Sequence, residues 1–327
     1  QAEDEIAAIT SVLGAAFTGK LAVTASSGPG IALKGEAIGL AVITELPLVI
    51  LNIQRGGPST GLPTKTEQSD LFQAMYGRNG ECPCVVIAAS SPSDCFEVAL
   101  EASRIAMEHM TPVILLSDGY IANGSEPWKI PDISKISSIK TNFAKPNSND
   151  YMPYKHDKKT LARKWAIPGM EGLEHRIGGL EKSDVTGNVD YDPKNHHFMT
   201  LQRQKKVDIV ANFIPKATVY GNSNGELLVL SWGGVYGSVK SAVSKAQELG
   251  MSVSFVHLRY LNPFPKNLGE LLVNFNKILI PELNLGQLLS IIRSKYLIDA
   301  KGLNKVAGKP FTSSEIFEKI ETILKEK

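Results

Sequence analysis

Apolar residues recur at two different periods along the first 127 residues, and each period predicts a different kind of element. Spacings of three and four predict helices at residues 4–17, 31–43 and 94–109. Continuous, branched apolar runs predict strands buried on both faces at residues 47–53, 85–89 and 112–116, with a shorter strand at 21–25. Strand and helix alternate at the interval of βαβ units. We therefore expect an α/β fold with a parallel sheet covered by helices on both faces.

The regular pattern stops near residue 128 and returns near residue 226. Between them Pro, Asn, Lys, His and Gly predominate, which predicts a long irregular connector that packs on its own chain or on a neighbour. Beyond it, we expect strands at residues 227–231, 253–258 and 277–281, and helices at 236–249, 268–275, 286–296 and 313–325. This divides the chain into a domain at 1–127, a connector or arm at 128–216 and a second α/β domain at 217–327.

The composition is that of a soluble globular protein, with 43% hydrophobic and 21% charged residues in a chain of 327. The net charge of +2 gives no reason to expect nucleic acid or an anionic membrane as a partner. The apolar runs are of strand length, too short to span a bilayer, and no signal peptide is visible. The three cysteines, Cys82, Cys84 and Cys95, fit a reducing cytoplasm. No cysteine or histidine cluster has the spacing of a metal site.

Ligands of open parallel sheets bind beyond the carboxyl ends of the strands. That rule selects three loops, at residues 26–30, 54–66 and 118–124. In the first loop, Ser27-Gly28-Pro29-Gly30 would let a ligand approach the backbone closely, or would simply form a tight turn. In the second, Arg55 ends a predicted strand, where it could bind a carboxylate or lie at the surface.

Two further patterns allow more than one interpretation. Glu3, Asp4 and Glu5 lie at the start of the first predicted helix, where acidic residues also complement the helix dipole. The run Trp232-Gly233-Gly234-Val235-Tyr236-Gly237 follows a strand but departs from the dinucleotide-binding pattern, so we interpret it as a turn.

Taken together, these features resemble a known family. Glu5, followed nine residues later by Gly14, then a strand and the Ser27–Gly30 turn, has the order of thiamine-diphosphate pyrimidine-binding domains such as those of acetolactate synthase-like enzymes. The stretch QRGGPSTGLPT at residues 54–64, with QSDL at 68–71, is specific to a smaller group of proteins. It resembles the α subunit of 2-oxoacid:ferredoxin oxidoreductases, near the 2-oxoglutarate branch. GGLE at 178–181 and ELNLGQ at 282–287 resemble the same family, and the similarity spans essentially the whole chain.

The resemblance implies a fold and a set of site residues. The fold would be a pyrimidine-binding domain and a transketolase C-terminal-like domain joined by the connector. Glu5 would hydrogen-bond a ring nitrogen of thiamine diphosphate and promote the tautomer that takes the proton from the thiazolium carbon. Arg55 would bind the substrate carboxylate, and Ser27, Gly28, Pro29 and Gly30 would lie beside the cofactor.

The resemblance also implies partners. The Gly-Asp-Gly motif that holds magnesium and the diphosphate is not in this chain, and neither are the cluster cysteines, so both are expected on a β subunit or other partners. Family members begin the pyrimidine domain with a strand and a Tyr-Pro-Ile-Thr-Pro-like turn. The sequence from Gln1 does not contain this piece, so we expect the start of the domain to be missing here. A dimer of heterodimers is expected, and the chain alone should be inactive.

The implied reaction is coenzyme A-dependent oxidative decarboxylation of a 2-oxoacid with reduction of ferredoxin. 2-Oxoglutarate, giving succinyl-CoA, is the first expectation for the substrate, followed by pyruvate and branched-chain oxoacids. Two alternatives stay open at this point: a subunit of a non-oxidative thiamine-diphosphate enzyme, and a non-catalytic assembly module.

Overall fold

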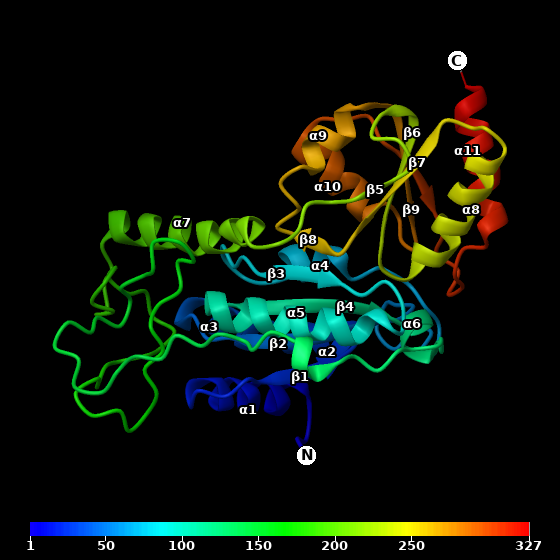
Figure 1. The fold of residues 1–327 in the computed structure, drawn as a ribbon. Coiled ribbons are helices and arrows are strands. Elements are labelled where there is room, and N and C mark those ends of the chain that lie inside the picture. Colours follow the sequence, from blue (N-terminus) through cyan, green and yellow to red (C-terminus); the bar gives the residue numbers. More distant parts are fainter. Residues whose placement is uncertain (327) are drawn as a thin grey trace.

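The chain folds into two α/β domains, with the connector along one side of the first (Figure 1). A computed structural model describes residues 1–326, and each domain contains a five-stranded sheet. Helices and strands alternate in both domains, which confirms the expected α/β class.

The first sheet holds four parallel strands and one antiparallel edge strand. In spatial order they are β1 (Val23–Ser26), β2 (Leu48–Gln54), β4 (Pro112–Asp118), β3 (Val85–Ala88) and β8 (Tyr260–Asn262). The expected parallel sheet is thus found, with one addition: the edge strand β8 comes from beyond the connector and runs antiparallel to β3. A strand of three residues is too short to show a readable alternation of apolar and polar positions.

Helices cover both faces of the first sheet. They are α1 (Glu5–Phe17), α2 (Gly28–Leu33), α3 (Gly35–Thr44), α4 (Leu71–Tyr76), α5 (Asp94–His109) and α6 (Gly119–Asn123). Ile50 packs in the core with α1 and α3, whereas its neighbour Val49 packs with α5 on the other face. Both faces of the sheet are therefore buried, which explains the continuous apolar runs in the sequence. The single helix predicted at 31–43 is in fact two helices that meet at Lys34.

The second sheet is also parallel except for one short edge strand. In spatial order it contains β10 (Lys301–Asn304), β9 (Phe275–Glu282), β6 (Gly225–Trp232), β7 (Val253–Leu258) and the antiparallel β5 (Val219–Tyr220). Its helices are η3 (Gly233–Val235), α8 (Tyr236–Glu248), α9 (Leu268–Val273), α10 (Gln287–Tyr296) and α11 (Ser313–Lys325). Phe275, predicted to end a helix, instead begins β9.

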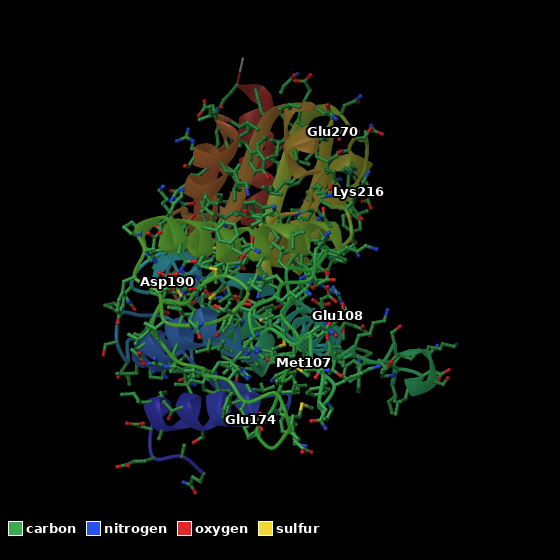
Figure 2. All side chains as sticks on the ribbon, turned by 90° about the vertical axis from the view of Figure 1, so that its left-hand side faces the viewer. Met107, Glu108, Glu174, Asp190, Lys216 and Glu270 are labelled. Atoms are coloured by element: carbon green, nitrogen blue, oxygen red, sulfur yellow. The ribbon has the colours of Figure 1, made fainter. Side chains whose placement is uncertain are left out.

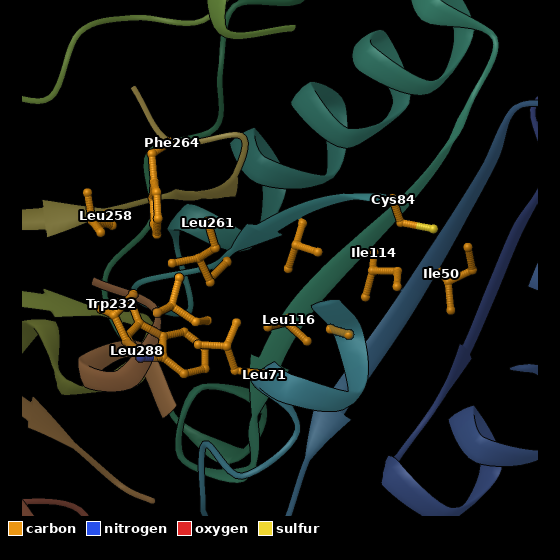
Figure 3. Close-up of a cluster of buried hydrophobic side chains, with 14 of the residues drawn as sticks. Ile50, Leu71, Cys84, Ile114, Leu116, Trp232, Leu258, Leu261, Phe264 and Leu288 are labelled. Carbon is orange, nitrogen blue, oxygen red and sulfur yellow. The ribbon is translucent and has the colours of Figure 1, made fainter. Parts of the chain in front are cut away.

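One hydrophobic core spans both domains (Figure 3). Ile50 and Ile114 of the first sheet belong to the same buried cluster as Trp232 of the second. Leu71 on α4 and Leu288 on α10 adjoin Trp232 in this cluster. The two domains are therefore joined by buried apolar contacts as well as by the connector.

The connector is more ordered than its sequence indicates. It contains η1 (Ile133–Lys135), α7 (Pro193–Ile209) and η2 (Val210–Asn212), so the expectation of a wholly irregular segment is wrong for the 17 residues of α7. Figure 2 faces the connector, with Met107 of α5 on the same side as Glu174 and Asp190. Met107 packs with Trp165, and the connector therefore packs on its own chain.

Candidate active site

Glu5 lies at the start of α1 and points toward the carboxyl end of β1. Asp4, and not Glu5, caps the helix, because Asp4 Oδ1 accepts a hydrogen bond from Ala7 N at 2.8 Å. Ser26 Oγ donates to Glu5 Oε1 at 3.2 Å. A Cβ atom at Gly30 would lie 2.6 Å from Glu5 Cγ and 2.8 Å from its Oε1. The missing side chain at Gly30 thus makes room for the Glu5 carboxyl.

Arg55 directly follows β2 at the same edge of the sheet. The strands β1 and β2 are neighbours, and Ser26 pairs in register with Asn52, so both candidate residues lie where these two strands end. The Arg55 side chain is half-buried, and its Nε is buried without a hydrogen-bond partner in residues 1–326. An unpaired buried donor is unfavourable. A ligand carboxylate would satisfy it, and a guanidinium binds that group in a bidentate manner.

A polar cluster lies against the Ser27–Gly30 turn. Asn52 Nδ2 donates to Asp70 Oδ2 at 3.0 Å, and Gln73 Nε2 donates to Gly28 O at 3.1 Å. A Cβ atom at Gly28 would lie 2.9 Å from Asp70 Oδ2. Burial raises the pKa of Asp70, which favours its neutral form. Asn52 Oδ1 and Gln73 Oε1 are buried acceptors without a partner among the described residues.

Lys34 is a further charged group near Glu5, and sequence reasoning missed it. Its side chain is fully buried at 0% exposure, between α2 and α3. The Nζ donates to Thr24 Oγ1 at 2.7 Å and to Ala25 O at 3.3 Å. Burial lowers the pKa of Lys34, and the charge of Glu5 acts in the opposite direction. A lysine inside a predicted helix is normally a surface residue, so no sequence pattern marks Lys34 as buried.

Two of the motifs noted in the sequence meet at the domain interface. Gln68 Nε2 donates to Trp232 O at 2.7 Å, and Gln68 Oε1 accepts from Leu283 N at 3.0 Å. Glu282 is buried and accepts hydrogen bonds from Trp232 Nε1 and Asn284 Nδ2, at 3.2 and 3.0 Å. Burial raises the pKa of Glu282. These side chains are satisfied by the chain itself, so they join the domains and are not free to bind a ligand.

The third predicted ligand loop is likewise used to join the domains. Asp118 Oδ1 accepts from Thr66 Oγ1 at 3.0 Å and caps α6, while its Oδ2 accepts from Gly234 N at 3.1 Å. The run from Trp232 to Gly237, interpreted as a turn, contains η3 and begins α8. A Cβ atom at Gly234 would collide with Asp118, so this glycine permits the contact.

The described part of the chain also has pockets away from Glu5 and Arg55. One, near the carboxyl end of α3, is lined by residues that include Leu40, Ile43, Cys82, Glu181 and Arg203. That position is at the amino ends of the strands, opposite to the edge with Glu5 and Arg55. No set of three or more His, Cys, Asp or Glu side chains within residues 1–326 is arranged to hold a metal ion. Nor is any helix of these residues long and apolar enough to cross a membrane.

Two family models match the chain. The model of the thiamine-diphosphate-binding region of pyruvate flavodoxin/ferredoxin oxidoreductases matches residues 1–192. The model of core domain II of pyruvate:ferredoxin oxidoreductase matches residues 225–316. The chain belongs to the 2-oxoacid:ferredoxin oxidoreductase family. The family membership expected from Glu5, Arg55 and the neighbouring motifs is thereby confirmed.

Among relatives, the 2-oxoglutarate oxidoreductase subunit KorA of Mycobacterium tuberculosis is 56% identical over 317 residues, covering 97% of this chain and 48% of that protein. The 2-oxoglutarate synthase subunit KorA of Methanothermobacter marburgensis is 31% identical, covering 98% of this chain and 85% of that protein. The chain thus spans about half the length of the M. tuberculosis relative.

Solved structures give the same family. The 2-oxoglutarate:ferredoxin oxidoreductase of Magnetococcus marinus, with 2-oxoglutarate, coenzyme A and succinyl-CoA bound, superposes with a TM-score of 0.94 at 34% identity. The match covers 99% of this chain and 57% of that one. A split-gene transketolase shares the fold alone, with a TM-score of 0.51 at 12% identity over 97% of this chain and 80% of that one.

The residues at the Glu5 edge fit thiamine diphosphate, the cofactor of this domain family. Within residues 1–326 the Glu5 carboxyl accepts one hydrogen bond, from Ser26, which leaves lone pairs for a ring nitrogen. The unpaired Nε of Arg55 and Oδ1 of Asn52 lie at the same edge. When bound, the cofactor would act as the electron sink for decarboxylation.

Proposed function

We propose that the protein containing this chain catalyses the coenzyme A-dependent oxidative decarboxylation of a 2-oxoacid, with 2-oxoglutarate as the first candidate. The carbon–carbon bond to the carboxylate breaks and carbon dioxide leaves. The acyl group passes to coenzyme A, and the electrons released by the oxidation reduce ferredoxin. The observation that supports this best is the 56% identity to a 2-oxoglutarate oxidoreductase subunit over 97% of the chain.

Within that reaction Glu5 is proposed as the catalytic residue that contacts the pyrimidine ring of the cofactor. Its place beside Ser26 and Gly30, at the carboxyl end of β1, supports this role. Ser27, Gly28, Pro29 and Gly30 would form the backbone wall against which the ring lies. Two side chains hold this turn in place: Gln73 donates a hydrogen bond to the carbonyl of Gly28, and the Asp70 carboxyl packs against Gly28.

Arg55 is proposed to bind the carboxylate of the 2-oxoacid. Its half-buried guanidinium has a free Nε in the described chain and follows the strand next to β1. A fixed cation would orient the substrate so that its keto carbon faces the cofactor. It would also lower the KM of the oxoacid.

The remaining components are proposed for partner chains. Magnesium, the diphosphate-binding motif and an iron–sulfur cluster would belong to a β subunit, and the complex would be a dimer of heterodimers. We also propose that the chain divides into a domain at residues 1–127, a connector at 128–216 and a second domain at 217–327. A cytoplasmic location would keep such a cluster, and the three free cysteines, reduced.

The test uses the full-length subunit co-expressed with its β partner. Reduction of a viologen or ferredoxin is followed with coenzyme A, thiamine diphosphate and a panel of 2-oxoacids. We expect reduction that requires coenzyme A and is fastest with 2-oxoglutarate. Oxoacid consumption without acceptor reduction would favour a non-oxidative enzyme. A complex that assembles with cofactor but consumes no oxoacid would favour a non-catalytic module.

A further inference from the structure

Lys34 carries a charge that its surroundings do not neutralise directly. It is fully buried, and no carboxylate in residues 1–326 lies within 4 Å of its Nζ. Its acceptors are the neutral oxygens of Thr24 and Ala25. A buried ammonium without an ion-pair partner is strongly unfavourable, and such groups cluster at functional sites.

The nearest acidic group on the packed elements is Glu5. Thr24, which accepts from Lys34, and Ser26, which donates to Glu5, are two residues apart on β1. Their side chains point to the same face of the strand, about 7 Å apart. On the helix side, Gly30 touches Glu5, and its carbonyl accepts from Lys34 N at 3.1 Å. Glu5 and Lys34 thus flank the same few atoms of β1 and α2.

Other charged groups around this pair are further away or exposed to water. Asp70 faces Gly28, at the opposite end of the turn from Lys34. Glu36 on α3, Asp4 before α1 and Lys20 before β1 are all exposed, so solvent screens their charges. Glu5 is therefore the group on which the Lys34 charge acts most.

We propose that Lys34 is a positioning residue for Glu5: its buried ammonium, held by Thr24 and Ala25 of β1, sets how readily the aminopyrimidine ring bound at Glu5 gains a proton. This rests on the function proposed above, in which Glu5 contacts that ring. A carboxylate and a ring nitrogen joined by a hydrogen bond titrate as one unit. A fixed positive charge near this unit disfavours the extra proton and moves its titration to lower pH.

Removal of the charge should therefore move the titration upward. For a charge held on the same face of β1 as the carboxyl, in a partly buried site, we expect a shift of about one pH unit or more. Lys34→Met removes the charge with little change of volume, and Lys34→Gln removes it but keeps a donor for Thr24 and Ala25. The readout is the near-ultraviolet circular dichroism of bound thiamine diphosphate, titrated with pH in the full-length complex with its β subunit.

Lys20→Met provides the matched control, because it removes the same charge from an exposed position. We expect the midpoint to rise in both Lys34 variants and to stay within about 0.3 units in the control. An unchanged midpoint in a Lys34 variant that binds the cofactor would overturn the proposal. Failure of both variants to assemble would also overturn it, because Lys34 would then be a folding residue.

The experiment distinguishes a failure of the positioning role of Lys34 from a failure of the proposed function. If the wild-type complex binds no thiamine diphosphate, the proposed function fails before Lys34 is tested. If the wild type binds the cofactor and turns over while the midpoint is insensitive to Lys34, only the positioning role fails.

Discussion

Ser26 Oγ donates a hydrogen bond to Glu5 Oε1 at 3.2 Å, and this bond joins the end of β1 to the start of α1. Glu5 lies at a helix start, where a carboxylate could equally well have capped the helix. Asp4 takes that role, and so the Glu5 carboxyl turns toward the sheet edge. Because Asp4 caps the helix, the Glu5 carboxyl is left available for the catalytic role proposed for it.

Glu5→Gln should remove turnover while leaving the complex assembled. A neutral amide keeps the size of the side chain but cannot exchange a proton with the cofactor ring. We expect kcat to fall by at least about 100-fold. Acceptor reduction and analytical ultracentrifugation of the complex with its β subunit measure the two effects.

Glu3→Gln is the matched control, since Glu3 is exposed two residues earlier. It should keep wild-type turnover. Activity of Glu5→Gln near that of Glu3→Gln would remove Glu5 from the catalytic site.

Arg55→Ala should raise the KM of the oxoacid by about 10- to 100-fold, because a charge-assisted hydrogen bond to the substrate carboxylate is lost. Arg55→Lys should recover only part of this, since an ammonium cannot form the bidentate contact. Initial rates across oxoacid concentrations give the values. Arg293→Ala, an exposed arginine on α10, is the control. An unchanged KM in Arg55→Ala would make Arg55 structural.

Gly30→Ala should abolish activity by displacing Glu5, because the added methyl group would collide with the Glu5 and Ser26 side chains. Gly14→Ala is its counterpart within α1: a Cβ atom there meets nothing within 4 Å. That change should be neutral or should stabilise the helix by up to about 1 kcal/mol. Activity assays and thermal melts of both variants decide the matter. An active Gly30→Ala complex would show that the carboxyl tolerates another position.

A buried ion pair anchors the connector to the first domain. Lys206 on α7 donates to Glu45 at the end of α3, and His156 Nε2 lies 2.9 Å from the same carboxylate. Lys206→Met leaves Glu45 buried without its main partner and should cost about 3–5 kcal/mol. Lys325→Met, which breaks a surface pair with Glu321, should cost at most about 1 kcal/mol. Equal melting temperatures of the two variants would contradict an anchoring role.

The same pair predicts a pH dependence of stability. Burial alone would raise the pKa of Glu45, but the Lys206 ammonium and His156 outweigh it and hold the pKa well below its usual range. Since the folded pKa lies below the unfolded value of about 4.3, the contribution is complete above that pH and is lost as the pH falls below it. Melting temperatures between pH 7 and 3 should fall more steeply for the wild type than for Glu45→Gln. Parallel curves would rule out a contribution from Glu45.

Strands buried on both faces could be predicted from the sequence, because the continuous apolar runs of β2 and β4 have the length and the branched residues of such strands. The sequence was insufficient for α7, because the buried face of that helix carries Arg203 and Lys206 beside Met199 and Val207. Two cations on the inner face hide the apolar stripe by which a helix is normally found. The Asp192-Pro193 pair was a usable signal, since Asp192 caps α7 and Pro193 is its first residue.

For the site, Glu5 and Arg55 were predicted, and the structure places them at the ends of neighbouring strands. Lys34 was not, because its burial depends on the break between α2 and α3, which no local pattern marks. Asn52 could have been found: it interrupts the run LVILNIQ near the end of a buried strand, where a polar residue requires a reason.

The strand β8 means that the linear order of the chain and its division in space do not coincide. Residues 260–262 are encoded after the connector, yet they pair with β3 and cover the edge of the first sheet. Any cut of the chain near residue 216 would leave Val86 and Ile87 on an uncovered strand edge, which is a template for aggregation. For an engineer, the smallest unit that can be expressed or exchanged is therefore the pair of domains together, and a swap of the first domain between relatives must carry β8 with it.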